Sequence, residues 1–354
     1  MTTPRERTRQ VRVGTVTIGG GAPVSLQSML DTDTLDVPAS LDRIDRLKGL
    51  GCDIVRVAIP SHAHLDAFAT ICAASPLPVV ADVHFDHRLA VAAAGMGAAK
   101  LRINPGNIGT LDNVDAVIDA AQAVNIPIRI GVNAGSLAER YHQDQRLTLS
   151  EKMVASAVEF VEYFQRRGFT QLVVSAKAAD VAATVATYEL LSAQLPELPL
   201  HLGITEAGTT QAGTVRSAVG IGALLLTGIG DTIRVSLTAS PTEEVRVGRD
   251  ILAAVGLDRS RPQLISCPTC GRCQVDLIPL ANRIGERLEQ ISKPLVVAVM
   301  GCVVNGPGEA AAADVGVACG RGTGAIFRNG AVLYTVAEDQ ILDALFKEIN
   351  NALD

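Results

Sequence analysis

The sequence predicts an α/β protein in which a (β/α)8 TIM barrel is followed by a small α/β domain. From about Gly20 to Gly256, short β-rich apolar runs alternate with amphipathic stretches rich in Ala and Leu. Hydrophobic residues make up 48% of the 354 residues but aromatic residues only 3%, which suits parallel strands covered by helices. A polar segment near residue 258 then separates this repeat from a shorter stretch with a different pattern.

Eight strand candidates divide the first part of the chain. They are Pro23–Met29, Asp53–Ile59, Leu77–Val83, Lys100–Asn104, Pro127–Val132, Gln171–Ala176, Leu198–Thr205 and Thr232–Leu237. Helices are expected between them, for example at Ser40–Leu50, His64–Ala74, Asn113–Val124, Leu149–Arg167, Ala179–Gln194 and Pro241–Val255. Eight such units close a TIM barrel. An open doubly wound sheet is the alternative, but the G-x-G-x-x-G motif of dinucleotide-binding folds is missing after the first strand.

The barrel is expected over residues 1–257, a linker at about 258–263 and the second domain over 264–354. The linker candidate is polar and contains Pro262. In the second domain, strands are expected at Leu264–Cys267, Leu295–Gly301, Val315–Ala318 and Val332–Val336, and helices at Val275–Glu289 and Glu338–Asn351. The glycine-rich run at 320–324 is typical of a turn rather than of a phosphate-binding loop.

Charge and composition argue against several classes of protein. The formal net charge of -6 and the shortage of aromatic residues disfavour a nucleic-acid-binding protein. The first residues are charged and lack the apolar core of a signal peptide, and no apolar stretch is long enough to span a bilayer. We therefore expect a cytoplasmic protein without membrane contact, whose seven cysteines are thiols or metal ligands rather than disulfides.

Four cysteines form a candidate metal centre. Cys267, Cys270 and Cys273 are spaced as C-x-x-C-x-x-C, and Cys302 follows an apolar strand candidate. Thiolates on a tight loop, joined by one from a distant strand, suit an iron–sulfur cluster or a zinc ion. A zinc ribbon normally supplies a second C-x-x-C knuckle, which Cys302 lacks, so the pattern favours a cluster. The remaining cysteines are expected to be packing residues: Cys52, Cys72 and Cys319.

Polar side chains recur where the barrel strands end, which is where TIM barrels carry their functional groups. In chain order they are Gln27, Ser28, Arg56, Asp82, His84, Arg102, Asn104, Arg129, Asn133, Lys177, Glu206 and Ser236. Four of these are cations, and convergent cations in an acidic protein predict an anionic ligand, most simply a diphosphate. The alternative is that each cation pairs with a neighbouring carboxylate such as Asp82 or Glu206.

The chain resembles the bacterial 4-hydroxy-3-methylbut-2-enyl diphosphate synthase family of the non-mevalonate isoprenoid pathway. Nearly the whole length takes part in the resemblance, and two cysteine motifs, SCPTCGR and GCVVNGPGE, are its most specific segments. The matching segments, in order, are VADVHFDHRLA at 80–90, LRINPGNIG at 101–109, IPIRIGVNAGSL at 126–137, HLGITEAG at 201–208, GIGDTIRVSL at 228–237, SCPTCGR at 266–272 and GCVVNGPGE at 301–309.

The resemblance implies an iron–sulfur oxidoreductase that is a homodimer, with the cluster domain of one subunit closing over the barrel of the other. The implied substrate is 2-C-methyl-D-erythritol 2,4-cyclodiphosphate, opened reductively and dehydrated to (E)-4-hydroxy-3-methylbut-2-enyl diphosphate. Reduced flavodoxin or ferredoxin would supply the electrons. The implied cofactor is a [4Fe–4S] cluster held by Cys267, Cys270, Cys302 and Glu309.

The same resemblance assigns roles at the barrel strand ends. The implied diphosphate site comprises Arg56, Arg102, Arg129, Lys177 and Ser236, with His84, Asn104 and Asn133 nearby. Asp82 and Glu206 match the carboxylates near the reacting carbons, and Glu206 is a candidate for the acid that protonates the departing hydroxyl.

Two positions depart from the family pattern, and an alternative function stays open. Leu30-Asp31 replaces the usual Thr-Asn, and the family does not require Cys273. Spacing alone would make Cys273 the fourth cluster ligand, whereas a displaceable carboxylate from Glu309 better suits a catalytic cluster. The alternative function is a barrel lyase or aldolase of a phosphorylated substrate with a structural zinc and Lys177 as Schiff-base lysine.

Overall fold

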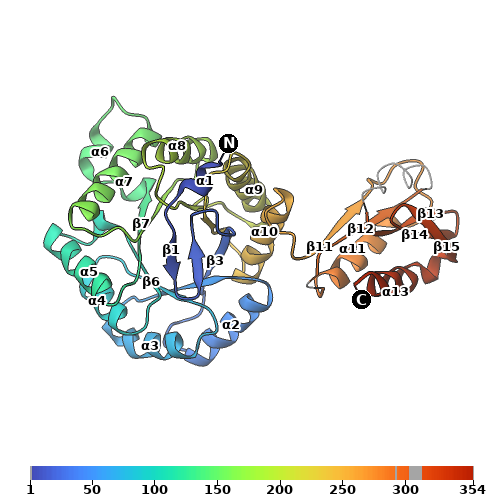
Figure 1. Cartoon of the computed structure of the whole chain (residues 1–354), viewed down its shortest axis with the longest axis horizontal. Helices are drawn as coiled ribbons and strands as arrows, with labels where there is room; N and C mark the ends of the chain where they lie inside the picture. Colours follow the sequence, from blue (N-terminus) through green and yellow to red (C-terminus); the bar gives the residue numbers. More distant parts are fainter. Residues whose placement is uncertain (1, 292, 303–312, 354) are drawn as a thin grey trace. The chain divides into compact units, whose positions relative to one another are not determined.

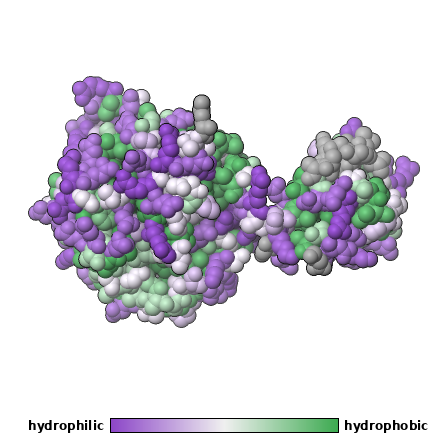
Figure 2. All heavy atoms as spheres, in the orientation of Figure 1, coloured by the Kyte–Doolittle hydropathy of each residue, from purple (hydrophilic) through white to green (hydrophobic). Residues whose placement is uncertain are grey.

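The structure is a computed structural model that describes residues 2–291, 293–302 and 313–353. The chain divides into two compact units, Met1–Leu257 and Asp258–Asp354. Both units are α/β, and helices surround the strands of the first unit (Figure 1). Hydrophilic side chains cover much of its visible face (Figure 2). In the described part of the chain, no helix is both long and apolar enough to cross a membrane.

The first unit is a barrel of eight parallel strands. The strands pair in the order β8-β7-β6-β5-β4-β3-β10-β9, and a parallel bridge between Val174 and Leu200 joins the two ends. Their bounds are β3 Ser25–Met29, β4 Ile54–Ala58, β5 Val79–Asp82, β6 Lys100–Ile103, β7 Ile128–Asn133, β8 Leu172–Lys177, β9 His201–Leu202 and β10 Thr232–Ile233. The predicted fold class is therefore confirmed.

Helices connect successive strands and cover the outside of the barrel. They are α2 Val37–Gly49, α3 Leu65–Ala74, α4 His87–Gly95, α5 Leu111–Ala123, α7 Leu149–Arg166, α8 Val181–Gln194, α9 Thr210–Leu226 and α10 Pro241–Ala254, with the short α1 Pro4–Arg7 and α6 Glu139–Gln143. Their starts follow local chemistry. Asp36 and Asp180 accept hydrogen bonds from backbone N–H groups of the first turns of α2 and α8, and Thr148 forms a capping box with Glu151 at α7.

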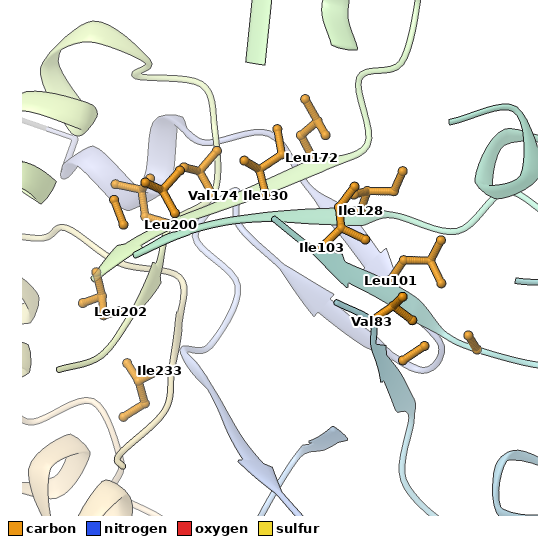
Figure 3. Close-up of a cluster of buried hydrophobic side chains, with 14 of the residues drawn as sticks. Val83, Leu101, Ile103, Ile128, Ile130, Leu172, Val174, Leu200, Leu202 and Ile233 are labelled. Atoms are coloured by element: carbon orange, nitrogen blue, oxygen red, sulfur yellow. The ribbon is translucent and has the colours of Figure 1, made fainter. Parts of the chain in front are cut away.

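Alternation along the strands separates an apolar layer from a polar interior. In β6, Leu101 and Ile103 belong to the large apolar cluster under the helices, while Lys100 and Arg102 are buried outside that cluster. Figure 3 shows ten labelled members of this cluster gathered along neighbouring strands. Because successive strand side chains point to opposite faces, the residues between them must face the barrel axis. The polar interior is therefore a direct consequence of the strand pattern.

A small hairpin, which the sequence prediction missed, packs at the N-terminal end of the barrel. It consists of β1 Val11–Val13 and β2 Val16–Ile18. Val13 and Ile18 pack against Ile54 and Val80, which lie at the start of their strands. Three-residue strands carry too little alternation to be recognised in the sequence. This apolar cluster covers the N-terminal end of the barrel, so the polar interior is open toward the C-terminal ends of the strands.

Two of the barrel strands are shorter than predicted. The expected strands at 198–205 and 232–237 are reduced to two residues each, β9 and β10. At Gly203 a Cβ atom would lie 2.6 Å from the Arg234 carbonyl oxygen. The segments after β9 and β10 therefore approach too closely here for any side chain at position 203. The close approach explains why glycine follows directly after β9.

Over its described residues, 258–291, 293–302 and 313–353, the second unit comprises a five-stranded sheet and the helices α11 and α13. The sheet order is β11-β12-β13-β14-β15, parallel among the first three strands and antiparallel among the last three. The bounds are β11 Pro262–Ser266, β12 Leu295–Met300, β13 Val315–Gly320, β14 Thr323–Arg328, β15 Ala331–Ala337, α11 Leu277–Leu288 and α13 Ile341–Leu353. Strand β11 begins inside the expected linker, and the predicted set of strands omitted β14. The glycine-rich run contains the turn at Arg321-Gly322, and β14 starts directly after it.

Candidate active site

The four cations predicted at strand ends lie deep in the barrel interior, together with a fifth, Lys100, which begins β6 and was not predicted. Each of the four predicted cations is at most 8% exposed: Arg56, Arg102, Arg129 and Lys177. Lys100 is fully buried and lies two residues before Arg102, on the same side of β6. Two of these cationic side chains, Arg102 and Lys177, lie against glycines of neighbouring strands or of the segments that follow them. A Cβ on Gly131 would lie 2.8 Å from Arg102 Nε, and one on Gly203 would lie 2.6 Å from Lys177 Nζ. The glycines therefore leave room for the long cationic side chains to cross their neighbouring strands.

Asp82, at the end of β5, holds one group of these side chains together. Its carboxylate lies 3.2 Å from Arg102 Nη1, 3.6 Å from Arg56 Nε and 3.4 Å from His84 Nε2. Burial by itself would raise the pKa of Asp82, but Arg56, the hydrogen bond with His84 and Arg102 outweigh it and hold this pKa well below its usual value. Asp82 is therefore an ionised carboxylate that orients two guanidinium groups, and it is not a proton donor at neutral pH.

A second ion pair inside the barrel was not singled out in the sequence. Arg234, from the segment after β10, lies 3.4 Å from a carboxylate oxygen of Glu244 on α10. Ser28 and the backbone N–H of Leu237 also donate to Glu244. Arg234 precedes the predicted residue Ser236 by two positions, so strand alternation was a usable signal for it. Nothing in the local sequence marks Glu244, because its partner comes from a different element.

The barrel interior contains more cations than carboxylates. Among the described residues, six basic side chains share the interior with two acidic groups, Asp82 and Glu244; the six are Arg56, Lys100, Arg102, Arg129, Lys177 and Arg234. Pairing with carboxylates therefore explains Arg56, Arg102 and Arg234 but leaves Lys100, Arg129 and Lys177 without an ion pair within the described residues. The alternative that every cation is neutralised by a neighbouring carboxylate does not hold.

Several guanidinium N–H groups point into the interior without a partner. Arg129 Nη1 donates to Ser175 Oγ at 2.6 Å, but its Nε and Nη2 have no acceptor among the described residues, and the same holds for Nε of Arg102 and of Arg234. Burial, with Arg56 and Arg102 nearby, pushes the pKa of Arg129 well below its usual range. Buried donors and positive charge that lack partners are costly, so this interior is suited to a ligand with several negative oxygens.

The other predicted site residues lie around this cationic interior. Asn104 is buried and donates its amide to Ser136 Oγ at 2.9 Å, which fixes the loop after β6. Asn133 ends β7 and, like Ser236, is half-buried. Glu206 is exposed on the loop after β9, where its φ of 52° places the backbone in the left-handed region. Within the described ranges it forms no ion pair, so its carboxyl is available to a ligand.

The unusual pair Leu30-Asp31 is accommodated without disturbing the interior. Leu30 is buried in the barrel's apolar cluster, and Asp31 lies 3.5 Å from Arg43 Nε on α2. Leu30 therefore contributes to core packing, and Asp31 pairs with an arginine of α2 rather than with a cation of the interior.

In the second unit, neighbouring strands bring three cysteines to one end of the sheet. Cys267 follows β11 and Cys302 follows β12, which pairs with β11 in parallel. The N–H of Gly301 donates to Cys267 Sγ at 3.1 Å. A Cβ on Gly301 would lie 2.5 Å from Cys273 Sγ and 3.6 Å from Cys267 Sγ, so two sulfurs flank this glycine. Cys270 is exposed on the connecting loop, and Cys302 is buried.

The sulfur donors fit an iron–sulfur group by their chemistry. Thiolates from two strand ends and backbone N–H donors to sulfur are features of such sites. Within the described residues, no group of three His, Cys, Asp or Glu side chains is already arranged around a metal position. The predicted ligand Glu309 lies outside the described residues. By contrast, burial raises the pKa of Cys52, Cys72 and Cys319 to about 12, as expected for packing thiols.

The fold and the site together define a class: a TIM-barrel protein with a cation-rich interior suited to a multiply charged anion, in a chain that also carries a thiol-bearing α/β domain. Comparison with known proteins makes this specific. Residues 8–249 match the GcpE TIM-barrel domain, and residues 263–351 match the GcpE protein C-terminal domain. The chain belongs to the GcpE family.

Curated relatives match over almost the full length of the chain. A protein of Geobacter sulfurreducens is 52% identical over 349 residues, covering 99% of both chains, and one of Caldanaerobacter subterraneus is 49% identical, covering 98% of this chain and 97% of its own. Both are named 4-hydroxy-3-methylbut-2-en-1-yl diphosphate synthase (flavodoxin).

Solved structures share the barrel but little of the sequence. A dihydropteroate synthase of Coxiella burnetii has a TM-score of 0.51 at 13% identity, covering 70% of this chain and 98% of its own. The spore coat polysaccharide biosynthesis protein spsE of Bacillus subtilis also has a TM-score of 0.51 at 13% identity, covering 70% of this chain and 72% of its own. At this identity the likeness concerns the fold alone.

Proposed function

We propose that this chain is an iron–sulfur oxidoreductase that converts 2-C-methyl-D-erythritol 2,4-cyclodiphosphate into (E)-4-hydroxy-3-methylbut-2-enyl diphosphate in isoprenoid precursor biosynthesis. Two electrons and two protons enter, the ring C–O bond to the diphosphate breaks, and one water leaves. The observation that carries the proposal is the uncompensated cationic interior of the barrel, in a chain about half identical to synthases of this name. The alternative of a zinc-containing lyase or aldolase has no support in these relatives.

The barrel side chains bind and orient the diphosphate. Arg129 and Lys177 supply positive charge that no described carboxylate pairs with, and Arg56 and Arg102 are held in place by Asp82. Further hydrogen-bonding groups around them come from Ser236, Asn104, Asn133 and His84. A diphosphate anchored at both phosphates fixes the reacting carbons relative to the protein, which is catalysis by positioning.

One proton of the reaction is assigned to Glu206. Its carboxyl is exposed and forms no ion pair with described residues, whereas Asp82 is held ionised by Arg56, by its hydrogen bond with His84 and by Arg102. A carboxyl group that is free of a fixed cation can carry a proton and release it to a departing hydroxyl. Asp82 then acts by orienting Arg56 and Arg102 and by balancing charge near the substrate.

The proposed cofactor is a [4Fe–4S] cluster held by Cys267, Cys270, Cys302 and Glu309. When bound, such a cluster supplies electrons one at a time, which side chains cannot do. The protein supplies Gly301, whose N–H donates to Cys267 and whose missing side chain leaves space for the sulfurs. We further propose reduced flavodoxin or ferredoxin as electron donor, a homodimer and a cytoplasmic location, with no nucleic-acid or membrane partner.

Anaerobic turnover tests this function directly. Purified protein is given the cyclodiphosphate and a chemical one-electron reductant, and the product is identified by mass. We expect a product that has lost one oxygen from the substrate composition, and a brown protein with visible absorption from the cluster. A colourless zinc-containing protein that forms no product under these conditions would refute the proposal.

A further inference from the structure

Lys100 is a fully buried lysine that the proposed reaction does not use. It is the first residue of β6, two positions before Arg102, and its side chain is 0% exposed. Its Nζ donates to the side-chain carbonyl oxygen of Gln27 at 3.4 Å, which is a weak contact. It has no ion pair with any described residue. A buried ammonium group without a counter-ion is strongly destabilised.

The groups that face Lys100 from the surrounding strands destabilise its ammonium form further. Arg56 on β4 and Arg129 on β7 are cations within electrostatic reach, and His201 on β9 is buried with an unpartnered Nε2. The paired residue on β5 is the apolar Val80. The two carboxylates of the interior are already engaged, Asp82 by Arg56 and Arg102 and Glu244 by Arg234.

In the absence of an anion, the uncharged amine is therefore favoured at this position. Burial, followed by Arg129 and Arg56, lowers the pKa of Lys100 well below its usual value. Several negative oxygens bound to Arg129 and Arg56 would offset the positive potential that these residues create at Lys100. The ammonium form of Lys100 would then gain the counter-charge that the protein itself does not provide.

We propose that Lys100 is a positioning residue of the substrate site, which takes up a proton when the diphosphate binds and thereby adds the innermost positive charge only in the complex. The inference rests on the proposed function, because it requires a polyanion at Arg129 and Arg56. Lys100 acts through the electrostatic potential at these two residues rather than by touching the substrate. Binding coupled to proton uptake weakens as pH rises, because the proton becomes harder to obtain.

The test is calorimetric binding of the cyclodiphosphate to the oxidised, cluster-loaded protein without reductant, so that no turnover occurs. Measurements at the same pH in two buffers of different ionisation heat give the number of protons taken up on binding. Three proteins are compared: wild type, Lys100→Met and the control Lys48→Met, which changes an exposed lysine on α2. Met preserves the length of the side chain but cannot be protonated.

We expect wild type and Lys48→Met to take up the same number of protons, and Lys100→Met to take up about one fewer. The affinity of both proteins is measured against pH. For each pH unit, the affinity of the wild type should fall by up to about tenfold more than the affinity of Lys100→Met. A merely structural role for Lys100 would change stability but not the proton count. Lys100→Gln repeats the comparison if Lys100→Met does not fold.

Equal proton uptake in wild type and the Lys100 variants would overturn the inference, as would a wild type that binds without taking up any proton. Failure of the proposed function looks different, because wild-type protein would then not bind the cyclodiphosphate at all. The two failures are therefore distinguished within one set of titrations.

Discussion

Replacing Arg129 by Met should abolish most substrate affinity while leaving the fold intact. Arg129 is 2% exposed and has one hydrogen bond, to Ser175, while two of its N–H-bearing nitrogens have no partner in the described part of the chain. These free donors are suited to a two-point, charge-assisted contact with a phosphate. Losing such a buried contact costs roughly 2–5 kcal/mol. At about 1.4 kcal/mol per factor of ten, affinity should fall by roughly 30-fold to several thousand-fold.

Stability should move in the opposite direction from affinity. Arg129 has no carboxylate partner among the residues that the structure describes, and its burial lowers its pKa well below the usual range, so the guanidinium destabilises the unliganded fold. We expect Arg129→Met to unfold at the same or a higher temperature than wild type. Removing Arg102 instead would leave Asp82 with only Arg56 and His84, so that variant should lose stability as well as affinity.

The assay is equilibrium binding of the cyclodiphosphate to oxidised protein at fixed ionic strength, together with thermal unfolding. The matched control is Arg166→Met, which removes an exposed arginine whose ion pair with Glu162 lies on the surface of α7. The control should keep wild-type affinity. Wild-type affinity in Arg129→Met would show that the unpaired donors do not face the ligand, and the diphosphate assignment would be withdrawn.

Three further outcomes are expected. Glu206→Gln should bind substrate normally and turn over much more slowly, since an amide cannot deliver a proton; wild-type kcat at saturating reductant would remove Glu206 as the acid. Cys273→Ser should keep the cluster, whereas Glu309→Ala should lose most activity and show one labile iron by spectroscopy; the reverse pattern would establish four-cysteine ligation. Burial raises the pKa of Asp231 from 3.8 to about 6, so the folded state retains a proton that the unfolded state has lost across this window, and this contribution to stability falls as pH rises through it. In Asp231→Asn, the free energy of unfolding, measured with urea between these pH values, should fall less steeply with pH than in the wild type. An equal pH dependence in the two proteins would show that Asp231 has an ordinary pKa.

Much of the candidate site could be predicted because barrel strands impose a strict alternation. Once the strands were located, Arg56, Arg102 and Arg129 had to share the interior with the other inward residues. The cysteine group was predictable for a similar reason, since Cys267 and Cys302 each follow a strand and parallel strands end on the same edge. The same rule applied consistently would also have found Lys100 and Arg234, two residues before Arg102 and Ser236.

Other features depended on contacts between distant parts of the chain. The hairpin of β1 and β2 is recognisable only when Val13 and Ile18 are seen against Ile54 and Val80. The glycine after β9 is required because Gly203 lies against the backbone of Arg234, a contact that no local pattern encodes. Strand β14 is held by pairing with β13 and β15 and escaped detection in the glycine-rich run before it.

The sequence by itself determined the βα repeat, the residue types at the strand ends and the cysteine spacing, because each depends on a local period or motif. Only the tertiary structure decided which charges neutralise one another. Glu244 on α10 pairs with Arg234, and Asp82 pairs with Arg56 and Arg102. Arg129 has no carboxylate partner in the described part of the chain. Charge balance is a sum over neighbours from many strands, and it becomes defined only when the barrel closes and fixes their distances.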